Sequence, residues 1–316
     1  GYTDIFYTGI AKAVHHCDVR SLYPSILLKN QTGPRRDELG IFLKLLDYLR
    51  TLRLDTRQKM KASAAPEERF HLDAMQSTFK ILINSFYGYL GFSQARFSDF
   101  DLAEQVTAEG RNLLHNMVDR IRQLGGQPIE IDTDGIYFVP PSFSTRAGLE
   151  DFETAIQSSL PTGIDVEFDG FYPAMFSYKM KNYALLEENG EMVIKGAALK
   201  SRGLEPFQRQ FLEEWLRLKL EDRDKEIPAL TAKFREHIEQ RRWPIRMLAK
   251  TETLQDSVAT YRDKIGRGGR GRNAAYELAL QSGRDYRPGD QISYYVTGAR
   301  KNVAALLNCC GKKRAS

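Results

Sequence analysis

Two aspartates far apart in the chain stand where strand-forming segments end. Asp18 follows the sequence AVHHC at 13–17, and Asp134 lies with Asp132 in a turn between two apolar arms. Carboxylates hold Mg²⁺ well, because this ion keeps waters and phosphate oxygens as its other ligands. Two such ions roughly 3.5–4 Å apart can activate an attacking hydroxyl and stabilise a leaving oxygen. The aspartates therefore predict metal-assisted phosphoryl transfer.

Cations for a triphosphate could come from a helical hairpin between the two aspartates. Residues 38–64 carry apolar residues at helical spacing, Pro66 interrupts this pattern, and a second helix is expected from 67 to 87. Arg53, Arg57 and Lys80 lie on these helices. Their charges could neutralise a triphosphate and the departing pyrophosphate.

Each of these motifs also has a structural explanation. An Asp-x-Asp-Gly sequence makes a good turn, because Asp and Gly tolerate the dihedral angles that turns require. A basic helix is usually a solvated surface, and Asn84 and Tyr87 could be hydrogen-bonded core residues. The segments at 18–26, 80–88 and 131–138 occur together and in this order, which favours a functional interpretation.

The remaining pattern predicts an α+β fold with an inserted helical hairpin and a helical domain at the C-terminal end. Ser98 or Asp99 could cap a long helix that ends before Gly125. Hairpins are expected at 128–139 and 181–197, and helices at 206–222, 226–240 and 273–282.

Composition indicates a globular protein of the cell interior. Of the 316 residues, 42% are hydrophobic and 28% charged, and the three cysteines lack the spacing of a disulfide framework or a zinc finger. These cysteines favour a reducing, cytoplasmic location. The sequence shows no uncharged apolar run of membrane-spanning length and no signal-peptide layout. Residues 241–316 hold 16 Lys and Arg against 6 Asp and Glu, which predicts a polyanion contact near this end.

Four segments resemble the motifs of family B DNA polymerases. They are DVRSLYPSI at 18–26, KILINSFYG at 80–88, IDTDGIYF at 131–138 and YKMKNYALL at 178–186. The resemblance implies a right-hand polymerase with a mixed or antiparallel palm sheet. The palm would comprise residues 1–34 and 89–204, the helical-hairpin fingers 35–88, and a mainly helical, shortened thumb 205–316.

The same resemblance implies roles for individual residues. Asp18, Asp134 and the carbonyl of Val19 would bind the metal ions, with Asp132 as a supporting acid at the primer end. Tyr23 would stack under the sugar and exclude a 2′-hydroxyl. The other residues implied to bind the nucleotide are Ser21, Leu22, Arg53, Arg57, Lys80, Asn84, Tyr87 and Gly88.

DNA contacts are expected at two places. Lys181 and Tyr183 would touch the primer end. Residues 266–271 match a GxGxxG dinucleotide motif, but a polar, helix-like segment precedes them where that motif needs a buried strand. We interpret them as a basic thumb loop whose Arg267, Arg270 and Arg272 contact DNA phosphates.

The expected activity is template-directed addition of deoxynucleotides to a primer 3′ end with two Mg²⁺ ions, for which Mn²⁺ could substitute. Primer-template DNA and deoxynucleoside triphosphates would be the partners of a monomer in a bacterial or archaeal cytoplasm, without a membrane. One alternative is a non-catalytic nucleic-acid-binding fragment of such a polymerase. A polymerase that makes or copies RNA is disfavoured by Tyr23.

Two residues depart from the family pattern. Gly135 stands where many members have Ser, and Arg57 where Lys is common. Arginine keeps the charge but differs from lysine in geometry. The 17 residues before Asp18 leave no room for a 3′–5′ exonuclease, so proofreading is expected to be missing from this chain, which could be a fragment of a longer protein.

Overall fold

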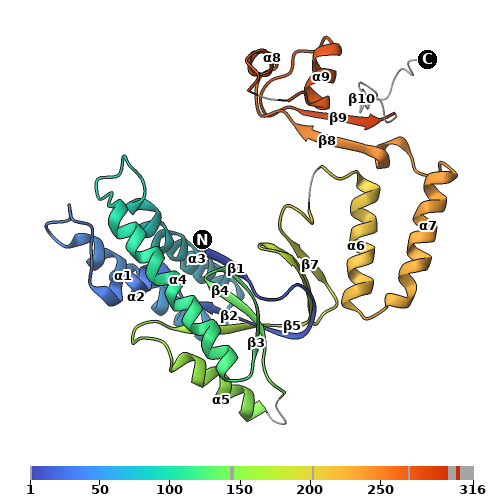
Figure 1. Cartoon of the computed structure of the whole chain (residues 1–316). Coiled ribbons are helices and arrows are strands. Elements are labelled where there is room, and N and C mark those ends of the chain that lie inside the picture. Colours follow the sequence, from blue (N-terminus) through green and yellow to red (C-terminus); the bar gives the residue numbers. More distant parts are fainter. Residues whose placement is uncertain (1, 143–145, 201–202, 270, 298–303, 307–316) are drawn as a thin grey trace. The chain divides into compact units, whose positions relative to one another are not determined.

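The computed structural model describes residues 2–142, 146–200, 203–269, 271–297 and 304–306 (Figure 1). Contacts within the chain divide it into two compact units. The first comprises residues 1–181 and 187–189, and the second residues 182–186 and 190–316. The boundaries of palm, fingers and thumb given above stay a prediction.

An antiparallel sheet forms the centre of the first unit. Its strands are adjacent in the order β1, β3, β4, β2, β5. Strand β2 is therefore flanked by β4 and β5, and both strands of the β3–β4 hairpin belong to this sheet. The bounds are β1 (Tyr2–Ile5), β2 (Gly9–Val19), β3 (Gln127–Thr133), β4 (Gly135–Val139) and β5 (Val166–Lys179).

Helices bury one face of this sheet. Helix α4 (Phe100–Gln123) packs on β3 and β4 and contacts α1 (Leu22–Asn30) and α5 (Arg146–Gln157). Its buried residues recur every three or four positions, as an amphipathic helix requires. The side chain of Asp99 caps its first turn by accepting a hydrogen bond from the N–H of Leu102, which confirms the predicted start of this helix.

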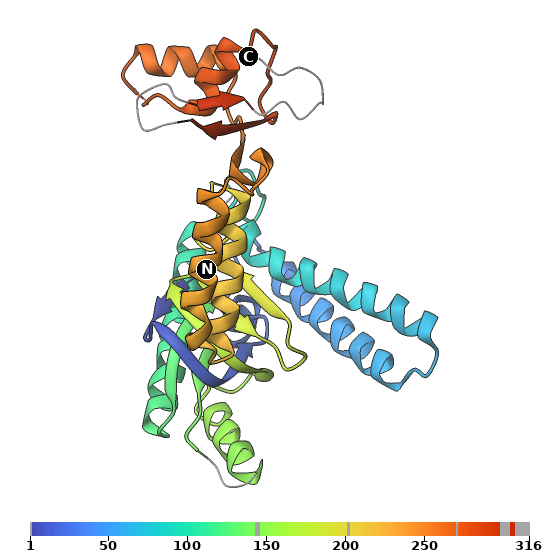
Figure 2. The ribbon, with the colours of Figure 1, turned by 90° about the vertical axis from the view of Figure 1, so that its right-hand side faces the viewer.

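The predicted helical hairpin is present. Helices α2 (Ile41–Ala62) and α3 (Pro66–Leu90) pack against each other along their length (Figure 2). Three residues connect them, and Pro66 opens α3 at a position where its missing N–H costs no hydrogen bond. Because the hairpin belongs to the first unit, its cations have defined positions relative to the sheet.

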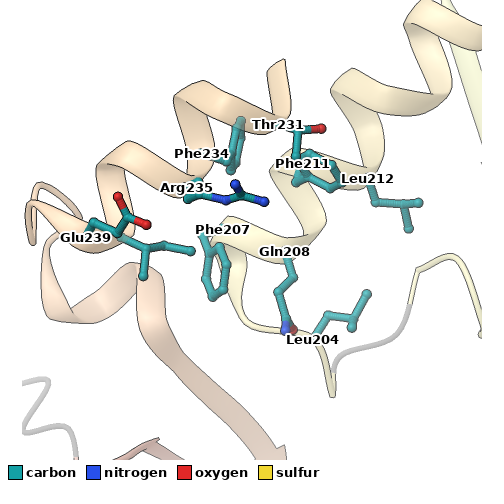
Figure 3. Close-up of a pocket in the computed structure, with 10 residues that line it drawn as sticks. Leu204, Phe207, Gln208, Phe211, Leu212, Thr231, Phe234, Arg235 and Glu239 are labelled. Carbon is teal, nitrogen blue, oxygen red and sulfur yellow. The ribbon is translucent and has the colours of Figure 1, made fainter. Parts of the chain in front are cut away.

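The second unit contains a β-hairpin, two long helices and a small sheet. The hairpin is β6 (Asn182–Leu186) and β7 (Met192–Lys195), as predicted, and the helices are α6 (Pro206–Leu220) and α7 (Ile227–Glu239). Phe211 and Phe234 meet edge to face between these helices, beside a hollow of about 590 Å³ (Figure 3).

The sequence analysis did not anticipate the small sheet of the second unit. Strands β8 (Ala249–Thr253), β9 (Gln291–Val296) and β10 (Ala304–Leu306) pair in the order β10, β9, β8. Helices α8 (Val258–Gly266) and α9 (Ala274–Gln281) contribute to its core, in which the rings of Tyr261 and Tyr276 stack. Within the described ranges, no helix combines the length and apolarity needed to cross a bilayer.

Candidate active site

Strand pairing brings the two predicted metal-binding aspartates together. Strands β2 and β4 pair so that Asp18 lies opposite Gly135, the residue after Asp134. The N–H of Val19 donates a hydrogen bond of 2.9 Å to the Asp134 carbonyl. Thr133 adopts a positive φ of 73°, which lets the chain turn tightly from β3 into β4. Asp18 and Asp134 thus become neighbours where β2 ends and β3 turns into β4.

Electrostatics distinguish these carboxylates from ordinary surface acids. Burial, followed by the nearby charges of Asp134 and Asp169, raises the pKa of Asp18 to about 7. Burial also raises the pKa of Asp134, whereas Lys80 lowers the pKa of both groups. The Oδ1 atom of Asp18 is buried and has no hydrogen-bond partner among the described residues. A cation beside this oxygen would offset the repulsion and the lost hydration.

The donor set fits magnesium that is completed by other oxygens. The described part of the chain holds no group of three or more His, Cys, Asp and Glu side chains with the geometry of a metal site. Two carboxylates with one orphaned oxygen match an ion that retains waters and substrate phosphates. Val19 is buried beside Asp18, and the role of its carbonyl stays a prediction.

A small arginine-lined cavity lies between α2 and the segments that follow β2 and precede β5. Its volume is about 50 Å³, and its lining residues are Arg20, Ser21, Arg50, Arg53, Leu54, Arg57, Ile83 and Asp165. The Arg53 guanidinium reaches the Ser21 hydroxyl at 3.5 Å. The Nε of Arg53 is buried without a partner among the described residues. Burial and the charge of Arg57 lower the pKa of Arg53. This concentration of positive charge suits a phosphate group.

Two arginines and two acids of this region were missed by the sequence analysis. Arg20 and Arg57 both approach Glu167, at 3.4 and 3.3 Å, and Arg50 lies 3.7 Å from Asp165. Arg50 stands three residues before Arg53 and seven before Arg57, so helical periodicity could have placed it on the same face of α2.

The predicted sugar gate is held between two elements. The rings of Tyr23 and Tyr87 lie 4.4 Å apart, centroid to centroid. On α4, Gly110 has no side chain, and a Cβ there would come within 3.1 Å of the Tyr23 ring. The structure thus brings Tyr23 and Tyr87 together and fixes the Tyr23 ring by packing. Asn84 and Gly88 are exposed on the same helix as Tyr87.

The predicted primer-end residues are brought together only in part. The Lys181 ammonium lies 3.7 Å from the Asp132 carboxylate and donates to the Thr133 hydroxyl at 3.3 Å. Tyr183 belongs to the second unit, where it is buried and pairs with Lys195. Of the predicted thumb arginines, Arg267 and Arg272 are exposed beside α8, and Arg270 lies outside the described residues.

Known proteins share sequence and fold with this chain. The family model "DNA polymerase family B" matches residues 30–312. The chain belongs to DNA polymerase family B. A DNA polymerase of Pyrococcus glycovorans is 32% identical over 228 residues, which are 64% of this chain and 29% of that protein. A DNA polymerase of Thermococcus sp. (strain 9oN-7) is 27% identical over 323 residues, covering 94% of this chain and 41% of its own length.

The fold also matches a solved structure of this family. The family B DNA polymerase of Pyrobaculum calidifontis superimposes with a TM-score of 0.70 at 23% identity, covering 96% of this chain and 43% of that one. This likeness and the antiparallel sheet confirm the predicted α+β polymerase fold. The chain spans less than half the length of these family B relatives.

Glu130 supports the backbone of Lys181 from within the sheet, and the sequence analysis missed it. Its side chain is fully buried on β3, and its Oε1 accepts a hydrogen bond of 2.6 Å from the N–H of Lys181. Lys181 has a positive φ of 61°, a backbone conformation that needs such support. Burial raises the pKa of Glu130 to about 7. A glutamate between two isoleucines, Ile129 and Ile131, was the available signal.

Glu130→Gln is expected to stabilise the fold at neutral and alkaline pH. The pKa of Glu130 is raised from its ordinary 4.5 to about 7 in the folded protein. Ionisation of this carboxyl therefore lowers the stability of the fold as the pH rises from about 4.5 to about 7. The glutamine amide still accepts the hydrogen bond from the N–H of Lys181, and it cannot ionise, so it does not lose stability at high pH. The variant should therefore match wild type near pH 4.5 and exceed it at pH 8 by about 1–2 kcal/mol in urea unfolding. Glu130→Met, which lacks the acceptor, should be destabilised throughout, and a difference independent of pH would contradict the assignment.

Proposed function

We propose that this chain carries the nucleotidyl-transfer site of a template-directed DNA polymerase, which adds deoxynucleotides to a primer 3′ end. The observation that carries the proposal is the pair Asp18 and Asp134. A cation would offset their repulsion and pair with the orphaned Asp18 oxygen, and the charge of Lys80 already acts on both carboxylates. Family membership and the likeness to archaeal DNA polymerases support it. Because the chain covers less than half of those relatives, its activity, substrates and partners belong to the proposal.

The proposed chemistry distributes roles over the first unit. Asp18 and Asp134 would hold two Mg²⁺ ions, which when bound activate the primer hydroxyl and stabilise the leaving phosphate oxygen. Arg53, Arg57 and Lys80 would neutralise the triphosphate. Mn²⁺ could replace Mg²⁺, because carboxylate and water ligands suit both ions.

The nucleotide and the primer would be oriented by neighbouring residues. Ser21 and Leu22 stand at the N-terminal end of α1, where free N–H groups favour a phosphate. Tyr23 would exclude a 2′-hydroxyl. Asp132 and Lys181, already paired, would lie at the primer end. We further propose primer-template DNA and deoxynucleoside triphosphates as partners, a monomeric state and a cytoplasmic location.

A labelled primer-template incubated with the full chain and deoxynucleotides tests the proposal. Extension is expected with Mg²⁺ and none with EDTA, and the added bases should follow the template. Binding of the same DNA, measured by fluorescence anisotropy, distinguishes the alternative. Binding without extension at any Mg²⁺ or Mn²⁺ concentration would favour the non-catalytic fragment and overturn the enzymatic proposal.

A further inference from the structure

A β-bulge beside the paired aspartates directs an acid toward His16. The pairing of β2 with β5 steps from His16 opposite Gly170 to Cys17 opposite Phe168, so Asp169 is the extra residue. Bulges re-aim side chains and are frequent beside active sites. The Asp169 carboxylate lies 2.7 Å from Nδ1 of His16. This contact fixes the plane and direction of the imidazole ring.

The other edge of the same ring occupies the space above Gly135. A Cβ built on Gly135 would lie 2.4 Å from Nε2 and 3.0 Å from Cε1 of His16, and 3.1 Å from the carbonyl oxygen of Cys17. The ring makes the closest of these contacts, and the tight carbonyl contact would remain without it. The ring also packs on Tyr137, at 4.5 Å between centroids. Since interiors tolerate no such overlap, His16 excludes every side chain at position 135 unless it moves.

Position 16 is well suited to act on the carboxylate pair. His16 and Asp18 are two residues apart on β2 and project from the same face. The ring crosses to β4 and covers the residue directly after Asp134. His15 points to the opposite face, where its ring meets Phe138 and Phe171.

We propose that His16, oriented by Asp169, is a positioning residue that holds the Asp134 turn against β2 and so fixes the separation of the two aspartates. Gly135 is then required by this chain because of His16, and the two positions act as one unit. The inference rests on the proposed function for its kinetic part and on geometry for its structural part. Partners that orient metal ligands commonly change activity by about 10–100-fold when removed.

A double-mutant cycle on the full chain tests this coupling. Gly135→Ser in the presence of His16 is expected to lower the melting temperature by about 3–8 °C. It should lower kcat for primer extension by about 10–100-fold and raise the Mg²⁺ concentration at half-maximal rate. The KM for deoxynucleotide should stay unchanged, because the arginine-lined cavity is not touched.

The informative arm combines Gly135→Ser with His16→Ala. This double variant should recover most of the loss in melting temperature and in kcat and approach His16→Ala alone, because only the tight contact with the Cys17 carbonyl then remains. His15→Ala is the matched control. In the Gly135→Ser background it should restore neither the melting temperature nor kcat. Asp169→Asn, which keeps an acceptor for Nδ1–H, should retain most of the kcat that Asp169→Ala loses.

The outcomes separate this inference from the proposed function. If neither the wild-type chain nor any variant extends primers, the proposed function and the positioning role are both overturned. The melting temperatures would still decide whether His16 and Gly135 are sterically coupled. Additive melting shifts would overturn the coupling. Coupled melting shifts with additive effects on kcat and on Mg²⁺ requirement would show a purely structural pair and overturn the positioning role.

Discussion

Asp18→Asn is expected to abolish primer extension and, at the same time, to stabilise the protein. If Asp18 holds the catalytic ions as proposed, loss of its carboxylate should lower kcat by about 10³-fold or more. The pKa of Asp18 is raised from 3.8 to about 7, so its charged form costs stability as the pH rises through that window. At pH 8 the neutral amide should raise the melting temperature of the first unit by about 3–6 °C, after allowance for solvent screening.

Single-turnover extension and thermal unfolding at pH 4.5 and 8 measure the two effects. Asp134→Asn should behave in the same direction, because burial also raises the pKa of Asp134. Asp132→Asn serves as the control in the same turn and should lose less activity, since Asp132 is paired with Lys181. Extension within tenfold of wild type by Asp18→Asn would refute its assignment as a metal ligand.

Tyr23→Ala is expected to lower discrimination against ribonucleotides by about 100-fold. The wild-type ring is fixed between Tyr87 and the backbone at Gly110, so it cannot retreat from a 2′-hydroxyl without displacing α4 or α3. The measured quantity is the ratio of kcat/KM for a deoxynucleotide to that for the matching ribonucleotide.

Tyr23→Phe supplies the control for the gate. Phenylalanine keeps the ring and its packing and removes only the hydroxyl, so most of the discrimination should remain. If Tyr23→Ala left the sugar preference unchanged, the steric role of Tyr23 would be wrong, and the ring would then serve only the packing seen against Tyr87.

The sequence predicted the elements that carry the site because their signals are local. Asp134 lies in a turn between two apolar arms, and Asp18 ends a strand, so their meeting required only that both strands join one sheet. The hairpin that carries Lys80 was visible from Pro66 and from helical periodicity. Family membership was evident from four short segments.

What escaped the sequence analysis depends on contacts between distant segments. The bulge at Asp169 becomes visible only in the pairing of β5 with β2, which also brings its carboxylate to His16. Glu130 gains its role from Lys181, 51 residues away. Strands β8 and β9 pair across the two intervening helices α8 and α9, so no short turn marked them as a hairpin.

The ion pairs between α2 and the start of β5 bear on how a triphosphate would enter. The guanidinium groups of Arg50 and Arg57 are already matched by the carboxylates of Asp165 and Glu167. A phosphate that binds these arginines must therefore displace a carboxylate of the protein itself. Its net binding free energy is the difference between the arginine–phosphate and the arginine–carboxylate interactions. A weakly charged anion would gain little binding energy from such an exchange. Asp165 and Glu167 therefore compete with incoming ligands for the arginines and favour binding of the most highly charged anion.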